Sequence, residues 1–463
     1  MSRTPRAALW VPLLFFLCVW GMSTRGRFSA SGDEPHYLII AESLVADGDL
    51  DLANNYANGA NRRFGPHVGD PDHAARTKTG AFWSIHDVGL PIVLLPAYAV
   101  LTRSAALAPM DVLARFRMSR GEFAYALLGL VLAGLVAAGL SLLVRAFARE
   151  SDARTAAWVV AVLAFSPPVI AHALLVFPET LAFVAVCGVV WLSCLREDEL
   201  TVRRVAFVLA GVGYLPLLHR KYALFMFGLL FVVFISRRSW FRRQRSPTLA
   251  GLGVIAVLPL IAIHLLMIVA WGSIGGPHAV NGWPFSMAGL PAGGLGLLFD
   301  RERGLFSYAP VYLIAPAAFA LSWRRSWPLV VPIALLYLPA AAFVFWHAGF
   351  SPAARFLLPM TPLVALAVVR AASSQVIRLV SAPLVILQAA ILIAVVDHPR
   401  VLWPKAMGTN QALERIPVVG PAYQTALPSI ATGDAVFGGW VWLGVVVVLT
   451  LAIVGAARRI RTP

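Results

Sequence analysis

Charged side chains are scarce in this chain. Asp, Glu, Lys and Arg together make up 13% of its 463 residues, whereas hydrophobic residues make up 59%. An average soluble domain carries about 25% charged residues, so the composition excludes an ordinary soluble globular protein. The apolar residues are gathered in long runs, which predict a polytopic membrane protein whose first partner is the lipid bilayer.

Cysteine is nearly absent, and acidic residues are few. The three cysteines, Cys18, Cys187 and Cys194, lie within apolar runs, which indicates neither a disulfide framework nor a cysteine-based metal site. Lys and Arg outnumber Asp and Glu by 38 to 22, a formal net charge of +16. Such an excess can indicate nucleic-acid binding. Here the arginines form short clusters between apolar runs, which is typical of cytoplasmic loops, so we expect no nucleic-acid partner.

No internal repeat and no separate soluble domain is visible. We therefore expect residues 1–463 to form one all-α polytopic membrane domain, with about 12 transmembrane helices and both termini inside. Residues 23–120 are predicted to form a first outer loop that carries juxtamembrane helices. Further outer loops are expected at residues 272–304 and 397–436.

Three segments of this topology need separate comment. The run from Ala7 to Met22 is expected to be the first span rather than a cleaved signal peptide, because arginines intervene before the small-residue site. Residues 85–101 are about one span long but contain Pro91 and Pro96, so we interpret them as a re-entrant or surface helix. Leu305 to Leu321 is predicted to cross the membrane.

The segment Ser31-Gly32-Asp33-Glu34-Pro35-His36-Tyr37 follows the first span and opens the polar loop. Pro35 suits the first turn of a helix, and the helix dipole favours an acid there. One interpretation is a capped surface helix, since acidic residues are common at helix starts. The other is a functional site, because interfacial carboxylates are costly unless they are paired or used. Tyr37 to Val45 is predicted to continue as an amphipathic interfacial helix.

Other polar groups are also predicted on the outer face. His219-Arg220-Lys221 lies between two apolar runs and suits a phosphate near the lipid headgroups, although a snorkelling anchor is an equal alternative. Glu179 begins a predicted span, where a helix-capping role is equally plausible. His347 and Arg355 lie at one outer mouth. Asp72-His73 and His86-Asp87 permit a divalent metal, but neither spacing is specific, so no cofactor and no metal ligand is firmly predicted.

The order of these motifs resembles that of the GT-C class of integral-membrane glycosyltransferases, near the protein mannosyltransferase and aminoarabinose transferase relatives. The resemblance covers residues 7 to 370 and rests first on the Asp-Glu pair of the first outer loop. The looser matches are Ser84 to Pro91, Phe177 to Glu179, His219 to Lys221, Gly304 to Pro310 and Ala354 to Pro359. The chain departs from many relatives at His86 to Pro91, where they carry a double proline.

The resemblance implies a glycosyltransferase of the inner, cytoplasmic membrane with its active site on the periplasmic face. Its donor would be a polyprenyl-phosphate sugar, and its acceptor a glycan, a lipid or a protein of the envelope. Asp33 and Glu34 would be the catalytic carboxylates: Asp33 would be the general base, and Glu34 would orient the loop or pair with Arg62 or Lys78. The residues expected to bind the donor phosphate are His219, Arg220, Lys221 and Arg355. Those expected to bind substrate are His36, Tyr37, His86, Asp87, Glu179 and His347.

The alternative is a transporter or flippase of lipid-linked sugars. Such a protein would also use outer cations and broken helices. An enzyme of this kind needs its acid and its cations on one face, whereas a carrier needs a polar path through the membrane.

The topology predicts which introduced cysteines an impermeant reagent reaches in intact cells. We expect labelling of Asn58→Cys in the first outer loop and no labelling of Gln244→Cys in an inner arginine cluster. Permeabilised cells, in which both sites should react, are the control. Labelling of Gln244→Cys but not of Asn58→Cys would overturn the topology.

Overall fold

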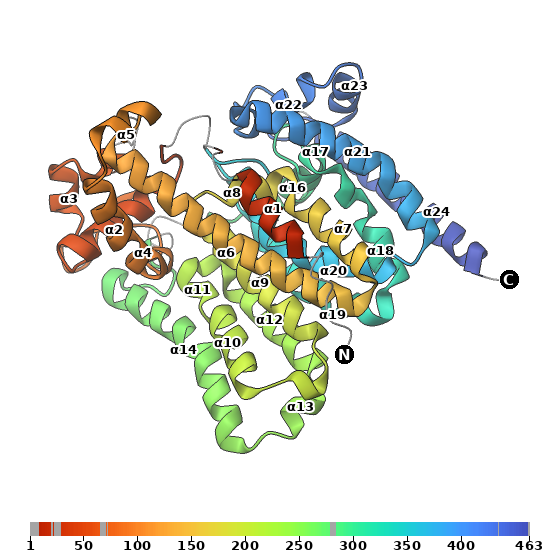
Figure 1. The fold of residues 1–463 in the computed structure, drawn as a ribbon, viewed down its shortest axis with the longest axis horizontal. Helices are drawn as coiled ribbons and strands as arrows, with labels where there is room; N and C mark the ends of the chain where they lie inside the picture. The colour runs from red at the N-terminus through yellow and green to blue at the C-terminus, as the bar shows by residue number, and fades with distance from the viewer. Residues whose placement is uncertain are drawn as a thin grey trace.

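The computed structural model describes residues 9–19, 22, 29–64, 71, 73–277, 284–433 and 435–461. Within them the chain is almost entirely helical (Figure 1). The one sheet in this part of the chain is an antiparallel hairpin of β1 (Ala74–Arg76) and β2 (Phe82–Ser84). The all-α prediction is therefore confirmed.

Six helices of the described chain are long and apolar enough to cross a membrane, judged by length and composition. They are α4 (Gly89–Ala106), α6 (Arg120–Glu150), α14 (Ser246–Trp271), α19 (Trp323–Ala342), α21 (Gln375–Asp397) and α24 (Val436–Arg461). Shorter apolar helices include α1 (Trp10–Val19), α7 (Ala153–Ala164), α9 (Pro178–Cys194) and α16 (Leu290–Phe299). The chain is thus a multi-pass membrane protein, and the count of about 12 spans stays a prediction.

The remaining helical elements are short or lie between these spans. They are α2 (Glu34–Ala46), α3 (Ala53–Ala57), η3 (Ala60–Phe64), α5 (Met110–Phe116), α8 (Pro167–His172), η4 (Glu197–Glu199), α10 (Val202–Gly213), α11 (Leu215–Leu218), η5 (Arg220–Tyr222), α12 (Ala223–Ser236), α13 (Arg238–Arg242), α17 (Leu305–Tyr308), η6 (Pro310–Ile314), α18 (Ala315–Leu321), η7 (Arg355–Met360), α20 (Thr361–Ala371), η8 (Pro399–Leu402), α22 (Gln411–Glu414) and α23 (Val419–Ala426).

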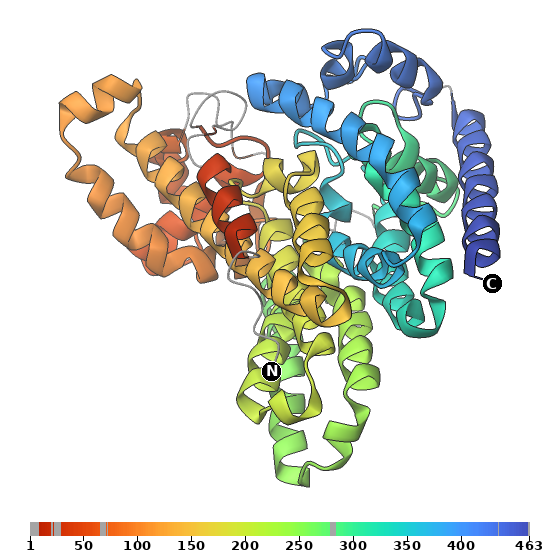
Figure 2. The same ribbon diagram turned by 45° about the vertical axis from the view of Figure 1, so that its right-hand side comes forward.

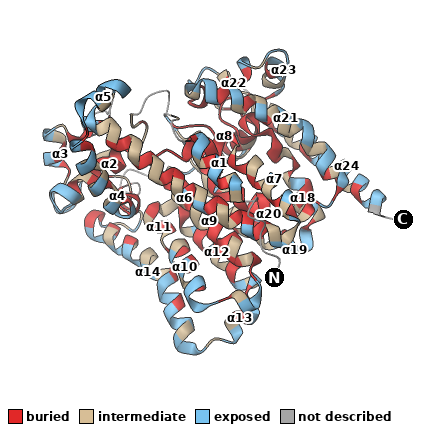
Figure 3. Ribbon diagram, viewed as in Figure 1, coloured by how far each residue is buried: buried red, intermediate tan, exposed pale blue. Residues whose placement is uncertain are grey.

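The outer helices expose apolar side chains, as lipid contact requires. On α14 the exposed residues include Val254, Leu258, Leu265 and Val269, and α24 likewise presents Leu451. In Figure 3 the exposed colour runs along α14, α21 and α24, whereas α6, α9 and α20 in the middle are largely buried. An exposed apolar surface along three long helices would cause association in water, so we infer that this surface contacts the hydrocarbon of a bilayer.

Helix α6 is the central element and runs diagonally across the molecule (Figure 1). It begins at a capping box formed by Ser119 and Glu122 and continues for 31 residues, about 46 Å at 1.5 Å per residue. It packs against α1, α4, α7 and α9. Its length separates two polar ends of the protein.

The predicted inner loops meet at one of these ends. Glu150, at the end of α6, pairs with Arg325 near the start of α19 and with Arg370 near the end of α20. At the same end Arg149 pairs with Glu199. The arginine clusters that suggested inner loops are thus neighbours in space, while the membrane side that this end faces stays a prediction.

Three local predictions are wrong. Helix α2 is not amphipathic, because every residue from Glu34 to Ala41 is buried. Pro91 and Pro96 do not interrupt α4: Pro91 lies in its first turn, where no backbone N–H is required, and Pro96 is accommodated inside the helix. The predicted span from Leu305 to Leu321 is instead broken into α17, η6 and α18, because Pro310 begins a new 3₁₀ segment.

A turn after α16 anchors the outer loops of the carboxy-terminal half. Asp300 accepts hydrogen bonds from the backbone N–H groups of Glu302, Arg303, Ile430 and Ala431. The Glu302 carboxylate likewise accepts from the backbone of residues 405–408. Arg303 donates to the carbonyl oxygens of residues 347 and 349, at 2.8 and 3.0 Å. The turn therefore fixes the loop that leads to Arg355.

The two views of the ribbon place the carboxy-terminal helix at the periphery. Turning the molecule by 45° brings α24 to the side of the bundle, where it contacts α16, α18 and α21 (Figure 2). The segment α2 to α5, which the sequence predicts to be part of the first outer loop, lies around the opposite end of α6 from α7 (Figure 1). This segment carries the residues singled out in the sequence.

Candidate active site

Asp33 lies at the start of α2 but does not cap it. It occupies the N-cap position and makes no side-chain hydrogen bond to the helix. Instead its Oδ2 lies 2.8 Å from Nη1 of Arg355, and its side chain is 24% exposed. The interpretation of this segment as a capped surface helix is therefore wrong. Helix α2 is buried, and Asp33 pairs with a cation that is far away in the sequence.

Glu179, at the start of α9, joins this pair to a second cation. Its Oε1 lies 2.8 Å from Nε of Arg355 and 2.5 Å from Nζ of Lys221. Glu179 is completely buried, and Phe177 and Phe356 flank the two cations, 4.1 Å from Cζ of Arg355 and 4.5 Å from Nζ of Lys221. An apolar surround strengthens the electrostatic attraction but makes any unpaired charge costly, so the four ionised groups depend on one another.

A second ion pair joins the loop between β2 and α4 to the start of η5. Nε of Arg220 is 2.7 Å from Oδ1 of Asp87, and the backbone N–H of Arg220 donates to Oδ2 at 2.9 Å. Nη1 of Arg220 also donates to the carbonyl oxygen of Gly275. His219 is 3.8 Å from the same Asp87 carboxylate. Asp87 thus holds the loop of residues 219–221 in place.

Glu34 is buried beside the network and has partners that the sequence did not indicate. Its Oε1 accepts from the hydroxyl of Tyr125 and from the backbone N–H of Val176, each at 2.8 Å. Its Oε2 accepts from the backbone N–H of Ser31 at 2.9 Å. The expectation that Glu34 pairs with Arg62 or Lys78 is wrong, because the side chain points into the helix bundle. Glu34 ties the start of α2 to α6.

The remaining predicted residues fall into two places. His36 and Tyr37 follow on α2, and the Tyr37 ring lies 4.9 Å from the ring of His86, beside Asp87. His347 lies in the loop held by Arg303, and its ring packs on Phe345 and Trp346. None of its contacts within the described chain is with the charged network. The structure thus brings together all the predicted site residues except His347.

The charges of this cluster balance, and the pairing controls protonation. Burial opposes the ionisation of Asp33, but the Arg355 guanidinium outweighs it and holds the pKa of Asp33 well below its usual range. Burial lowers the pKa of His86 to about 3, so its imidazole is neutral at pH 7. Asp33, Glu179 and Asp87 therefore face Arg355, Lys221 and Arg220 as three carboxylates and three cations.

Two participants were not predicted from the sequence. Tyr125 lies within the apolar run of α6, 91 residues from Glu34, where no local signal indicates a polar contact. Phe356 follows Arg355 as one more apolar residue of a hydrophobic segment. His73 was named in the sequence only as part of a possible metal pair, and it lies 2.9 Å from His86. Asp72 lies outside the described residues.

The chain was compared with known proteins. No family model and no curated protein matches its sequence. Its structure is similar to that of ArnT from Cupriavidus metallidurans bound to undecaprenyl phosphate, with a TM-score of 0.44 and 15% identity over 98% of this chain and 78% of that one. The apo structure of ArnT gives 0.42 and 16%, over 97% and 77%.

Glu34 predicts a pH dependence of stability. Burial raises its pKa from 4.5 to about 7 against the opposing effect of its hydrogen bonds. The unfolded chain therefore releases this proton at lower pH, and the free energy of unfolding falls as the pH rises from about 4.5 to about 7, by about 3 kcal/mol. Thermal unfolding in detergent across this range should show the fall in the wild type and a flatter profile in Glu34→Gln.

Glu414→Gln is the matched control, since Glu414 is exposed on a distant outer helix. It should keep the wild-type profile. An unchanged profile in Glu34→Gln would contradict the assignment of the titration to Glu34.

Proposed function

We propose that this protein is a membrane glycosyltransferase that transfers a sugar from a polyprenyl-phosphate donor to an envelope acceptor, at the outer face of the cytoplasmic membrane. The observation that carries the proposal is the network of Asp33, Arg355, Glu179 and Lys221. It places a partly exposed carboxylate and two cations side by side at one end of the membrane helices.

The reaction needs a base and a phosphate site, and no nucleotide fold. The acceptor oxygen or nitrogen bonds to the anomeric carbon as the bond from that carbon to the phosphate oxygen breaks. The acceptor proton passes to Asp33, and the phosphate leaves with the electron pair and is stabilised by cations. In this scheme the acceptor attacks the sugar directly and no carboxylate of the protein acts as the nucleophile, so the configuration at the anomeric carbon is inverted.

The pairing of Asp33 with Arg355 explains how a carboxylate of low pKa becomes a useful base. In the ligand-free protein Arg355 is shared between Asp33 and Glu179. A donor phosphate beside Arg355 competes for this cation and weakens its hold on Asp33. The pKa of Asp33 then rises toward the range in which it accepts a proton. Donor binding would in this way switch on the base.

Lys221 is the cation best placed for the phosphate. Its side chain is 21% exposed, against 6% for Arg355. Its ammonium group is a compact charge that can contact a phosphate oxygen without the fixed planar geometry of a guanidinium. Arg220 is held by Asp87 and Gly275, so we assign it to positioning of the loop. Within the described chain the buried Oε2 of Glu179 and the hydroxyls of Tyr37 and Tyr222 make no hydrogen bond. Their bonding capacity suits the polar groups of a sugar phosphate.

A small cavity beside the network offers apolar and aromatic surface. It is lined by residues of α2, the β-hairpin and α14, among them Trp83, His86, Met267 and Trp271. Ligand sites combine such walls with a few polar groups. Its volume of about 10 Å³ admits about one water molecule, so a donor or acceptor could enter only if this wall moves.

The distribution of charge favours an enzyme over a transporter of lipid-linked sugars. In the six long helices every Asp, Glu, Lys and Arg lies within two turns of a helix end. A carrier needs polar groups along a path near mid-membrane. The acid and its cations instead lie at one end.

Asp33→Asn tests the base. Asparagine keeps the shape and one acceptor oxygen but takes no proton at neutral pH. We expect sugar transfer to fall by about 100- to 10,000-fold in purified protein supplied with polyprenyl-phosphate sugars, with binding of the donor retained. Asp397→Asn, at an exposed helix end, is the matched control and should transfer at the wild-type rate. Transfer by Asp33→Asn at that rate would exclude Asp33 as the base.

Lys221→Ala tests the phosphate site. Removing a charge-assisted contact of roughly 1.5–3 kcal/mol should weaken binding of a polyprenyl phosphate by about 10- to 150-fold. The free energy of unfolding should fall by less than the free energy of donor binding does, because Glu179 keeps Arg355 as its partner. Lys405→Ala, which removes an exposed lysine of another outer loop, should bind as the wild type does. Wild-type affinity in Lys221→Ala would move the phosphate to Arg355.

A further inference from the structure

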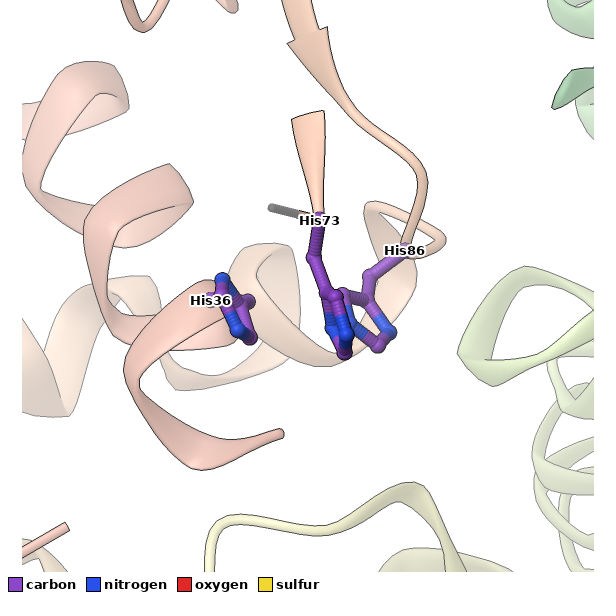
Figure 4. A group of neighbouring side chains, drawn as sticks. All are labelled: His36, His73 and His86. Atoms are coloured by element: carbon purple, nitrogen blue, oxygen red, sulfur yellow. The ribbon is translucent and has the colours of Figure 1, made fainter. Parts of the chain in front are cut away.

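Three histidines converge beside Asp33 although they come from separate parts of the first outer segment. His36 lies on the first turn of α2, His73 immediately precedes β1, and His86 follows β2. One ring nitrogen from each lies within 4.8 Å of the other two. Figure 4 shows the rings of His73 and His86 side by side, with His36 facing them from α2.

The distances fit a tetrahedral metal ion. Zinc binds imidazole nitrogen at about 2.0–2.1 Å, so two ligand nitrogens of a tetrahedral site lie about 3.3–3.4 Å apart. Nδ1 of His73 and Nε2 of His86 are 2.9 Å apart, slightly closer than this. His36 is stacked at 4.3 Å from the ring of His73 and 5.3 Å from that of His86. An ion bound by all three would replace the hydrogen bond between His73 and His86 and would require the stacked ring of His36 to turn toward them.

The hairpin holds two of the ligands in position before any ion binds. The Ser84 hydroxyl donates to the carbonyl oxygen of His73 at 3.3 Å and accepts from the backbone N–H of His86 at 3.1 Å. The backbone N–H of Ile85 also donates to the carbonyl oxygen of His73, at 2.9 Å. A backbone fixed in this way lowers the ordering cost of binding, which is the advantage of a preformed site.

We propose that His36, His73 and His86 form a zinc site with one open coordination position. Three histidines are a ligand set suited to zinc, and a fourth position left to water or a substrate oxygen distinguishes such a site from a closed structural one. The ion would fasten the β-hairpin to α2, three residues after Asp33, and so hold the start of α2. Zinc binding does not depend on the sugar-transfer activity proposed above.

Metal content of the full-length protein tests the site. Protein purified in detergent, stripped with a chelator and then dialysed against micromolar zinc should retain one zinc per chain by elemental mass spectrometry. His73→Ala should weaken zinc affinity by at least about 100-fold. His398→Ala removes an exposed histidine at the end of α21 and should keep the wild-type zinc content. Equal zinc content in the wild type and His73→Ala, or none in either, would overturn the proposal.

A second variant separates coordination from a merely structural role of the cluster. His73→Cys replaces the imidazole by a thiolate ligand and should restore zinc binding that His73→Ala loses. Cobalt in place of zinc gives a readout of geometry, since a tetrahedral site absorbs strongly in the visible range. Failure of His73→Cys to bind either ion, while the circular dichroism of the protein is unchanged, would show that the three histidines only pack together.

Discussion

The buried carboxylate of Glu179 is the group on which the candidate site depends. It carries two cations on one oxygen, of which Lys221 is partly exposed and Arg355 is almost fully buried. Removal of Arg355 would leave Asp33 without its cation and Glu179 with only one, and an uncompensated charge in an apolar surround is costly. Arg355 transmits this constraint to Asp33, so the position of the proposed base is set by a residue at the start of α9.

The fold supplies the support that the network needs. Arg355 lies on a short 3₁₀ segment after Ala354, which has a positive φ of 58°. A non-glycine residue in that region is uncommon and persists only where its surroundings determine it. The turn at Asp300 to Arg303 provides that support by binding the preceding loop through backbone carbonyl oxygens. On the Asp33 side of the network, Glu34 accepts a hydrogen bond from Tyr125 of α6 and so fixes the start of α2.

The network is balanced in charge, and this has a consequence for binding. A phosphate arriving at a site with free cations would be attracted by their charge alone. Here Arg355 and Lys221 already have carboxylate partners. Under the proposed function, an anion would bind by taking over a share of these two cations, and binding and activation of Asp33 would be two parts of one electrostatic exchange. Such a site would keep Asp33 inactive until the donor is present.

The sequence by itself determined the membrane class, the all-helical character and the candidate polar residues, because apolar runs, arginine clusters and helix-terminal prolines are local signals. Asp33, Glu179, Lys221 and Arg355 were recognised as costly charges in an apolar chain, without their partners. Only the tertiary structure decided that Arg355 joins Asp33 to Glu179, that Glu34 meets Tyr125, and that α2 is buried from Glu34 to Ala41. These contacts join residues as far apart in the sequence as Asp33 and Arg355, and pairing over such separations follows from helix packing, which no local pattern of residues encodes.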